Sequence, residues 1–530
     1  MMVPASEAAA LLPARAASRA LYDRARRCIY GFDVSDGLSW GIYTSVYSYY
    51  LVDVRGESER HASIKSSTGW AVGALGSTLA SPLLATLSDL VGRRPLFLFS
   101  CTAQVVQLTM LGLLPGSTAA WDANMFVLGF LDATSALGKV VVVDCVDAGF
   151  PIGGRRDDCA TRAVYGVLRG DGPQTSEKSY AVAFYYKWVL VGLGQLLGSG
   201  AVGYVLLSAL PAKRAMLACG LVRLPMYAVL WVRLPETLPA AAAAGSAAVA
   251  GAPCGLGAAL GDACRVAASL FARQLRTVPI LCRSRRSRLL LAAFFCVHTA
   301  QAGVFSMTIY WGRREFGWRY GETCCWLATT QLAAGVGSVV LMRATMPAMG
   351  FRRAVACHVL VAAKGALLVS VLGRPLVGPR DLPRDVADTY GRYVVMGLGA
   401  LVTQCFGVVP AVFSALTDRP RREGEKGQLQ GALHASVTIA SVCATTLFLF
   451  LYNTRRAPMC HHPNVIWEAT CLLLFVAGFA ITASGDPPKD EVDVTWAEAP
   501  GRPPREKDAY AAFNDHWGDD DDDDLPTATV

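Results

Sequence analysis

Charged side chains are scarce in this sequence. They make up 17% of the 530 residues, whereas 53% of the residues are hydrophobic. That balance excludes an ordinary soluble domain, which has a more polar composition. A membrane-spanning helix needs about 20 mostly apolar residues, and the chain contains roughly a dozen such runs. We therefore predict an all-α polytopic membrane protein that lies in a lipid bilayer.

The sequence signatures of catalysis and of cofactor binding are also missing. None of the 16 cysteines forms a Cys-x-x-Cys pair at metal-binding spacing, and most lie in apolar runs as small buried side chains. The nucleotide-binding pattern Gly-x-x-x-x-Gly-Lys-Ser/Thr is missing, which argues against a nucleotide-driven pump. Neither a His-Glu-x-x-His metal site nor a Gly-x-Ser-x-Gly nucleophile turn is present, which argues against an enzyme. We expect no metal and no cofactor.

The apolar runs predict twelve transmembrane helices, which we place at 33–53, 68–88, 95–115, 123–147, 183–208, 213–232, 288–311, 323–344, 353–373, 392–416, 432–452 and 465–483. Lys and Arg are concentrated in the N-terminal tail and in every second loop. Such an excess marks the cytoplasmic loops, so both termini are predicted to be cytoplasmic. Topology thus explains the net charge of +8, and we expect no nucleic-acid partner.

Five parts follow from this pattern. Residues 1–32 form an N-terminal cytoplasmic tail, and residues 33–232 form the first six-helix half. Residues 233–287 are a cytoplasmic linker with an amphipathic helix, and residues 288–483 form the second six-helix half. Residues 484–530 form an acidic, disordered cytoplasmic tail. The start of the chain resembles both an acidic dileucine sorting signal and a transit peptide, although a plain tail is the simpler interpretation. The choice between the plasma membrane and an endolysosomal membrane stays open.

One short polar turn stands out between the second and third predicted helices. It contains Asp89, Gly92, Arg93 and Arg94. Glycine permits a tight reversal with positive φ, and an arginine can offset an aspartate at a helix C-terminus. Such charges at a membrane border can hold helices together in one state and release them in another. The turn resembles the signature loop of the major facilitator superfamily, with Ala85 in place of its first glycine.

Further stretches are similar to one branch of that superfamily, the tetracycline/proton antiporters and the hippocampus-abundant-transcript-like transporters. They are 69–76, 36–44 and, in the loop between the tenth and eleventh helices, Glu425, Gly427, Gln430 and Gly431. The resemblance implies a monomeric carrier in which helices one, four, seven and ten line a central cavity. Many of these antiporters have an arginine early in helix four. In this chain the corresponding residues, 125–131, contain no arginine. The resemblance therefore does not carry over a proton-antiport mechanism.

Charged side chains inside spanning helices are candidate functional residues, because each costs several kcal/mol unless it is paired or hydrated. Asp36 lies in the first helix. Asp132 and Lys139 are seven residues apart in the predicted fourth helix and therefore on one face. Lys139 could pair with Asp132 or with Asp36 to hold helices together, or these residues could bind a solute or a proton.

Two further groups complete the candidate site. His298 and Gln301 lie three residues apart on the seventh helix, where a histidine could titrate near neutral pH or could simply pack through a hydrogen bond. Trp40 and Tyr43 lie on one face of the first helix and could stack on a ring-bearing solute or serve as packing.

These features predict a secondary active or facilitative transporter. We expect it to move a small organic solute by alternating access, with or without proton coupling. The alternative is a membrane receptor or solute sensor that has the same fold but does not transport.

Overall fold

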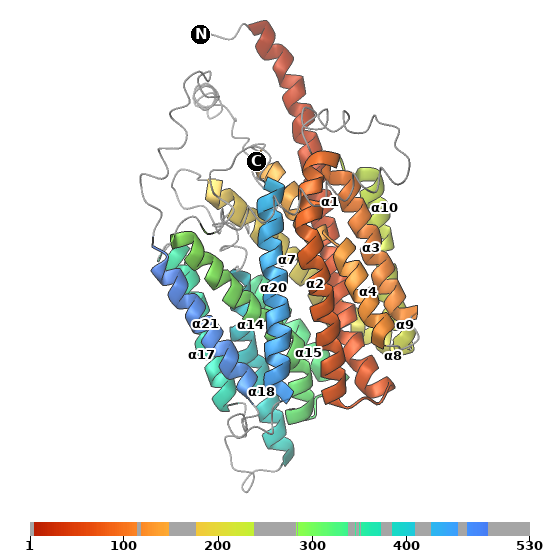
Figure 1. Cartoon of the computed structure of the whole chain (residues 1–530), viewed down its shortest axis with the longest axis vertical. Coiled ribbons are helices and arrows are strands. Elements are labelled where there is room, and N and C mark those ends of the chain that lie inside the picture. Colours follow the sequence, from red (N-terminus) through yellow and green to blue (C-terminus); the bar gives the residue numbers. More distant parts are fainter. Residues whose placement is uncertain are drawn as a thin grey trace, which may run out of the picture. The chain divides into compact units, whose positions relative to one another are not determined.

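The structure, a computed structural model, describes residues 5–113, 118–147, 176–237, 282, 285–337, 345, 349, 351–372, 384–408, 426–453 and 464–485. Every element in this part of the chain is helical (Figure 1). Most of the linker and most of the acidic tail lie outside the described residues, as does segment 148–175 of the first six-helix half. The boundaries of the five predicted parts therefore stay predictions.

Each of the twelve predicted ranges contains helix in its described residues. They are α1 (Ala5–Tyr49) with η1 (Tyr50–Val54), α2 (Glu59–Val91), α3 (Arg93–Leu113), α4 (Thr118–Leu131), α5 (Thr134–Asp147), α7 (Ser176–Leu196) with η2 (Leu197–Val202), α8 (Gly203–Ala209), α9 (Ala212–Leu221), α10 (Leu224–Arg233), α14 (Arg285–Phe316), α15 (Tyr320–Leu332) with η3 (Ala333–Gly337), α17 (Phe351–Leu372), α18 (Arg384–Thr403) with η4 (Gln404–Val408), α20 (Lys426–Asn453) and α21 (Val465–Ala483).

Two predicted helices are interrupted, and one is longer than expected. The predicted fourth helix is broken between α4 and α5, and the predicted sixth is broken between α9 and α10. The predicted N-terminal tail is helical from Ala5 and continues into the first span without a break. The last residues of the predicted eighth and tenth helices, 338–344 and 409–416, lie outside the described residues.

Eight helical stretches in the described residues are long and apolar enough to cross a membrane. The first, second, eighth and tenth predicted spans are not among them. The first carries the carboxylates of Asp33 and Asp36, which reduce its mean hydropathy.

A close helix crossing joins α1 to α7 and its continuation η2. Small residues with the spacing Gly-x-x-x-Gly line it on both sides: Gly37 and Gly41 on α1, and Gly194 and Gly198 on the other helix. A methyl group on any of these four glycines would lie closer than 3.0 Å to a backbone carbonyl oxygen of the facing helix. Glycine therefore permits the backbones to approach, a common way of packing membrane helices. This approach brings the polar residues of α1 close to those of α7.

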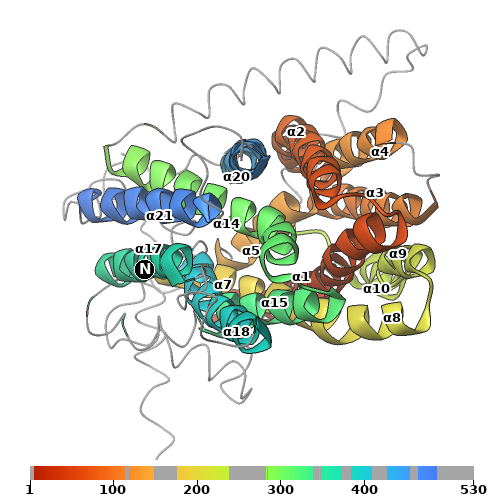
Figure 2. The same cartoon turned by 90° about the horizontal axis from the view of Figure 1, so that it is seen from below.

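Two helical groups meet along the middle of the molecule, and we name them by residue number. The N-terminal group is 5–237, and the C-terminal group is 285–485. α2 packs along α20, and α7 packs beside α15, as the end-on view in Figure 2 shows. The hydroxyls of Thr78 on α2 and Thr438 on α20 lie 2.6 Å apart at this boundary. We call the side where α1 meets the start of α3 the tail side, and the opposite side the far side.

Candidate functional site

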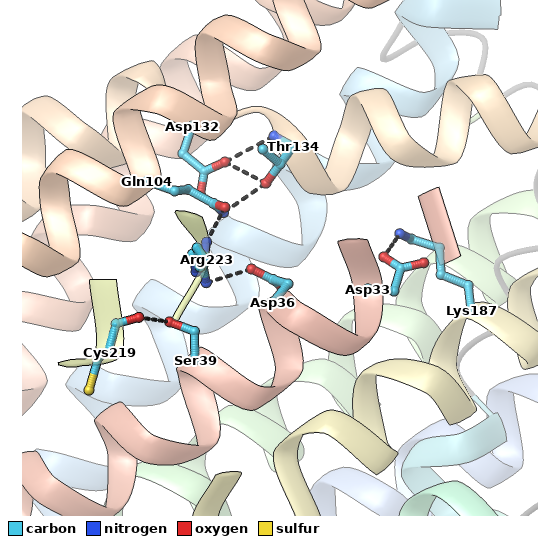
Figure 3. Close-up of polar contacts among 9 residues, drawn as sticks. All are labelled: Asp33, Asp36, Ser39, Gln104, Asp132, Thr134, Lys187, Cys219 and Arg223. Atoms are coloured by element: carbon cyan, nitrogen blue, oxygen red, sulfur yellow. Dashed lines mark hydrogen bonds and ion pairs between the residues drawn. The ribbon is translucent and has the colours of Figure 1, made fainter. Parts of the chain in front are cut away.

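A buried arginine is the centre of the polar network in the N-terminal group (Figure 3). Arg223 lies at the break between α9 and α10, and its side chain is 4% exposed. Its Nη2 lies 2.6 Å from Oδ1 of Asp36 on α1, and its Nη1 donates a hydrogen bond to Oε1 of Gln104 on α3. The guanidinium also lies 5.8 Å from the ring centre of Trp40, within cation–π range. One side chain thus connects three parts of the bundle.

The network continues to Asp132, which lies between α4 and α5. Gln104 Nε2 donates hydrogen bonds to Asp132 Oδ2 over 2.6 Å and to Thr134 Oγ1 over 2.7 Å (Figure 3). Asp132 Oδ1 accepts hydrogen bonds from the backbone N–H and the hydroxyl of Thr134, at 2.9 and 2.7 Å. A carboxylate that accepts from the first residue of a helix stabilises that N-terminus. Asp132 therefore fixes the start of α5.

These contacts correct the predicted pairing of Lys139. Asp36 pairs with Arg223, and Asp132 bonds to Gln104 and Thr134 rather than to the lysine. The prediction that Asp132 and Lys139 lie on one face of the fourth helix was wrong. The helix breaks after Leu131, so these two residues do not share a continuous helix. Arg223 lies inside a predicted span and could have been found by the rule that selected Lys139.

A second ion pair follows from the close crossing of α1 and α7. Lys187 on α7 donates to Oδ1 of Asp33 on α1 (Figure 3). The Asp33 and Lys187 side chains are 2% and 10% exposed, so the pair is buried. Neither residue was selected from the sequence, although both charges fall in predicted spans. The signal was present, but the pairing depends on the crossing.

A cavity of about 200 Å³ adjoins this ion pair, and we call it the charged cavity. It lies between the N-terminal group and helices α14 and α20 of the C-terminal group. Its titratable lining residues are Asp33, Asp36, Lys139, Lys187, His298 and His434. The structure therefore brings three predicted site residues, Asp36, Lys139 and His298, to one cavity.

A second cavity, of about 270 Å³, lies farther toward the far side, and we call it the aromatic cavity. α1, α2 and α7 line it from one group, and α14, α15 and α20 line it from the other. Its lining includes Tyr43 and Gln301 of the predicted site, further aromatic side chains and several hydroxyl groups, and none of the described lining residues carries a charge. His298 and Gln301, predicted to share a face, thus face adjoining cavities.

Aromatic stacking holds the wall of the aromatic cavity in place. The Tyr43 ring lies 5.2 Å from Tyr47 and 5.4 Å from Trp40, measured between ring centres. Trp40 in turn lies 5.3 Å from Trp70 on α2. Trp40 does not line the cavity itself but packs behind Tyr43. Of the two predicted stacking residues, only Tyr43 is positioned to touch a solute in this cavity.

On the far side, an ion pair joins the two helical groups. Nη2 of Arg313 on α14 lies 2.7 and 2.8 Å from the two carboxylate oxygens of Asp53 in η1. The ring of Tyr49 lies 5.4 Å from that of Tyr320 on α15. These contacts connect the groups beyond the aromatic cavity.

Solved structures of other proteins share this arrangement of helices, and two of them are described here. No protein-family model matches the sequence, and no curated protein matches it. The human organic anion transporter MFSD10 (TETRAN) superposes with a TM-score of 0.58 at 16% identity, over 87% of this chain and 99% of that one. A variant of the nucleoside transporter NupG gives a TM-score of 0.56 at 10% identity, over 87% of this chain and all of the other. Both are major facilitator superfamily transporters. This chain has the major facilitator fold. The predicted antiporter branch stays a prediction.

In this major facilitator fold the signature turn is held by carboxylates from elsewhere in the N-terminal group. Gly92 ends α2 with φ of +115°, a conformation that other residues resist. Arg93 is buried, and its Nε donates to Oδ2 of Asp144 on α5 over 3.1 Å. The Glu236 carboxylate accepts from the backbone N–H groups of Arg93 and Arg94, at 2.9 and 3.1 Å. It therefore caps α3.

Two predicted sets of residues are only partly described. The Asp89 side chain lies outside the described residues, so its predicted role stays a prediction. Glu425 also lies outside them. Gly427, Gln430 and Gly431 belong to α20, so the prediction that they form a loop was wrong. The helix of the eleventh span begins at Lys426, six residues before its predicted start, in spite of the low helix propensity of these glycines.

Proposed function

We propose that the protein is a secondary active or facilitative transporter, which moves a small organic solute across a membrane by alternating access. One observation carries the proposal: the aromatic cavity is lined by helices of both groups of a major facilitator fold. A site between two helical groups can be exposed to either side when the groups rock against each other. The two structural neighbours, an organic anion transporter and a nucleoside transporter, support the same reading.

One contact would regulate that rocking, and a second set of contacts would keep the N-terminal group together during it. The Asp53–Arg313 pair connects the groups on the far side, and its separation would open that side. On the tail side, Arg93 and Glu236 tie the start of α3 to α5 and to the end of α10. We propose that this turn is a conformational latch, which keeps the tail-side ends of these helices together as a unit.

Solute flux tests the proposal. The full-length protein is purified, reconstituted in proteoliposomes and assayed for uptake of a panel of labelled small organic solutes. Thr445→Phe, which fills part of the aromatic cavity, should reduce uptake at least tenfold. Thr446→Phe is the matched control, because Thr446 is the next residue of α20 and is exposed. Solute binding without uptake would favour the receptor or sensor instead.

Proton coupling is the finer part of the proposal. His298 and His434 line the charged cavity, and histidine is the side chain best suited to exchange a proton near neutral pH. Asp36 and Asp132 have fixed partners, so we expect Asp36→Asn and Asp132→Asn to reduce stability. His298→Gln should abolish acceleration of uptake by a pH gradient while solute exchange continues. Identical wild-type uptake with and without the gradient would rule out coupling.

We also propose that both termini are cytoplasmic, since Lys and Arg are enriched in the loops of that side. Tags at residues 10, 250 and 525 should be accessible from the cytoplasm, and tags at 58, 318 and 459 from the opposite side. Protease protection that places residue 250 opposite to residue 525 would contradict a six-plus-six arrangement.

A further inference from the structure

The two helical groups give the aromatic cavity different chemistry. The N-terminal group contributes most of its rings, which are Tyr43 and Tyr47 on α1, Trp70 on α2 and Trp188 on α7. Trp70 and Trp188 are only partly buried, so part of each ring is left uncovered. Aromatic side chains pack favourably against other rings, face to face or edge to face. The N-terminal wall of the cavity therefore favours a solute that contains a ring.

The C-terminal group contributes an unused hydrogen-bond acceptor. Gln301 on α14 lines the cavity, and its Oε1 is buried without a hydrogen-bond partner among the described residues. No other buried side-chain nitrogen or oxygen of the described lining lacks a partner. Buried polar atoms in folded proteins are nearly always hydrogen-bonded, so an unsatisfied acceptor in a cavity indicates a ligand that donates to it. An amide oxygen accepts from a hydroxyl or from an N–H group.

Serine and threonine hydroxyls of the lining add further acceptors. Those that donate to a backbone carbonyl three or four residues earlier on their own helix are Thr44, Ser48, Ser199, Ser306, Ser441 and Thr445. A hydroxyl carries a single proton, so each of these oxygens is left with acceptor capacity only. The tyrosine hydroxyls of the lining can donate or accept. A solute with hydroxyl or amide groups can therefore bond to this lining in both directions, and its donors have the more numerous partners.

Charge is the third property of the site. None of the described lining residues of the aromatic cavity carries a charge. An ion bound there would lose hydration without gaining a counter-charge, which is costly. The adjoining charged cavity does not supply one, because its lining contains two carboxylates, Asp33 and Asp36, and two lysines, Lys139 and Lys187, whose charges balance. The lining therefore favours an uncharged solute.

We propose that the solute is an uncharged, ring-bearing compound with at least one hydrogen-bond donor, an alcohol or an amide N–H. Its ring lies against the aromatic side chains of the N-terminal group, and its donor bonds to Oε1 of Gln301 on the C-terminal group. This inference rests on the proposed transport function and specifies its substrate class. The cavity volume of about 270 Å³ is near the lower end of the roughly 300–1,000 Å³ usual for small-molecule sites, so the solute has one or two rings. Both helical groups then hold the same solute.

Two matched series of probes test charge and donor separately. The first is 2-phenylethanol, its methyl ether, 2-phenylethylamine and phenylacetate. The second is phenyl glucoside, its tetramethyl ether, its 6-amino-6-deoxy analogue and phenyl glucuronide. Thermal unfolding of the purified full-length protein is followed as each probe is titrated. In at least one series the alcohol should bind about fivefold or more tightly than its ether, and about tenfold or more tightly than either ion.

Three results would overturn the proposal. One is binding of the ethers as tight as that of the alcohols in both series. Another is a preference for the amines, which attraction of cations to aromatic faces would produce, or for the acids. The third is a lack of binding by both alcohols.

A variant tests whether Gln301 is the acceptor. Gln301→Met removes the amide at similar side-chain length, so it should weaken alcohol binding about fivefold and leave ether binding unchanged. Gln107→Met is the matched control, because Gln107 is a buried glutamine of α3 that lines neither cavity and donates to Sδ of Met125 over 3.4 Å. Retention of the full preference for alcohol over ether in Gln301→Met would overturn the assigned acceptor. The comparison of probes on the wild-type protein tests the substrate class without any variant.

Flux distinguishes this inference from the proposed function. Uptake of the labelled probes into proteoliposomes is measured above the passive leak into liposomes without protein. An alcohol that binds as expected but is not taken up would contradict transport and leave the ligand class intact. Uptake of a charged solute by a protein that binds neither alcohol would support transport and overturn the ligand class.

Discussion

Replacing Arg223 by methionine is expected to destabilise the protein by about 3–5 kcal/mol, the usual loss when one partner of a buried ion pair is removed. Methionine retains most of the aliphatic stem but cannot pair with Asp36 or donate to Gln104. The Arg223 side chain is 4% exposed and that of Asp36 is 20% exposed, so water can replace the guanidinium only in part. The loss of the contact with Trp40 adds to the effect.

The assay is thermal unfolding of the purified protein in detergent, followed by tryptophan fluorescence. Arg214→Met is the matched control, because Arg214 is an exposed arginine of α9 and its replacement should change stability by less than about 0.5 kcal/mol. The double variant Arg223→Met/Asp36→Leu removes both charges, so it should be more stable than Arg223→Met, with a coupling of about 0.5–3 kcal/mol. Equal unfolding temperatures for Arg223→Met and Arg214→Met would refute the reasoning, as would simple additivity in the double variant.

Substitutions at three further places test other parts of the structure. Gly194→Ala should lower the unfolding temperature, because the added methyl group forces α1 away from α7. Gly397→Ala in α18 is the control, since its methyl group meets open space and should stabilise the protein by up to about 1 kcal/mol. Gly92→Ala should destabilise the protein by about 1–3 kcal/mol, because alanine is strained at a positive φ. Near-normal stability together with near-normal flux would mean that the turn is not a latch. Asp53→Asn should change the free energy of unfolding by less than about 1 kcal/mol, because the Asp53–Arg313 pair is partly exposed. It should nevertheless speed the chemical labelling of a cysteine on the far side, because that side opens more readily without the pair. The exchanged pair Asp53→Arg/Arg313→Asp should slow that labelling again, and unchanged rates in both variants would show that the contact does not control opening.

The helices were the most predictable part of the protein. A run of about 20 apolar residues predicts a spanning helix wherever it packs, because a backbone inside a membrane must satisfy its hydrogen bonds internally. Each of the twelve ranges contains helix in its described residues for this reason. The breaks at Asp132 and Arg223 were not predicted, since each interrupts an apolar run that is otherwise continuous. Both breaks are stable because side chains from other helices satisfy the polar groups there.

The candidate site was predictable in kind but not in arrangement. The rule that a charge in a spanning helix is functional selected Asp36, Asp132 and Lys139, and it applies equally to Lys187 and Arg223. It could not assign the partners. Asp132 proved to cap α5, which is a local role, whereas Lys139 lines a cavity together with residues of the C-terminal group.

The sequence by itself determined the class of the protein, the places of its helices and the turn at Gly92, because apolar length and glycine act locally. The tertiary structure alone decided which charges meet. Asp33 reaches Lys187 because glycines on α1 and α7 let those two helices approach, and Asp36 reaches Arg223 because a break in another helix positions that arginine. Ion pairing depends on distances of a few ångströms between residues far apart in the chain, and helix packing sets those distances.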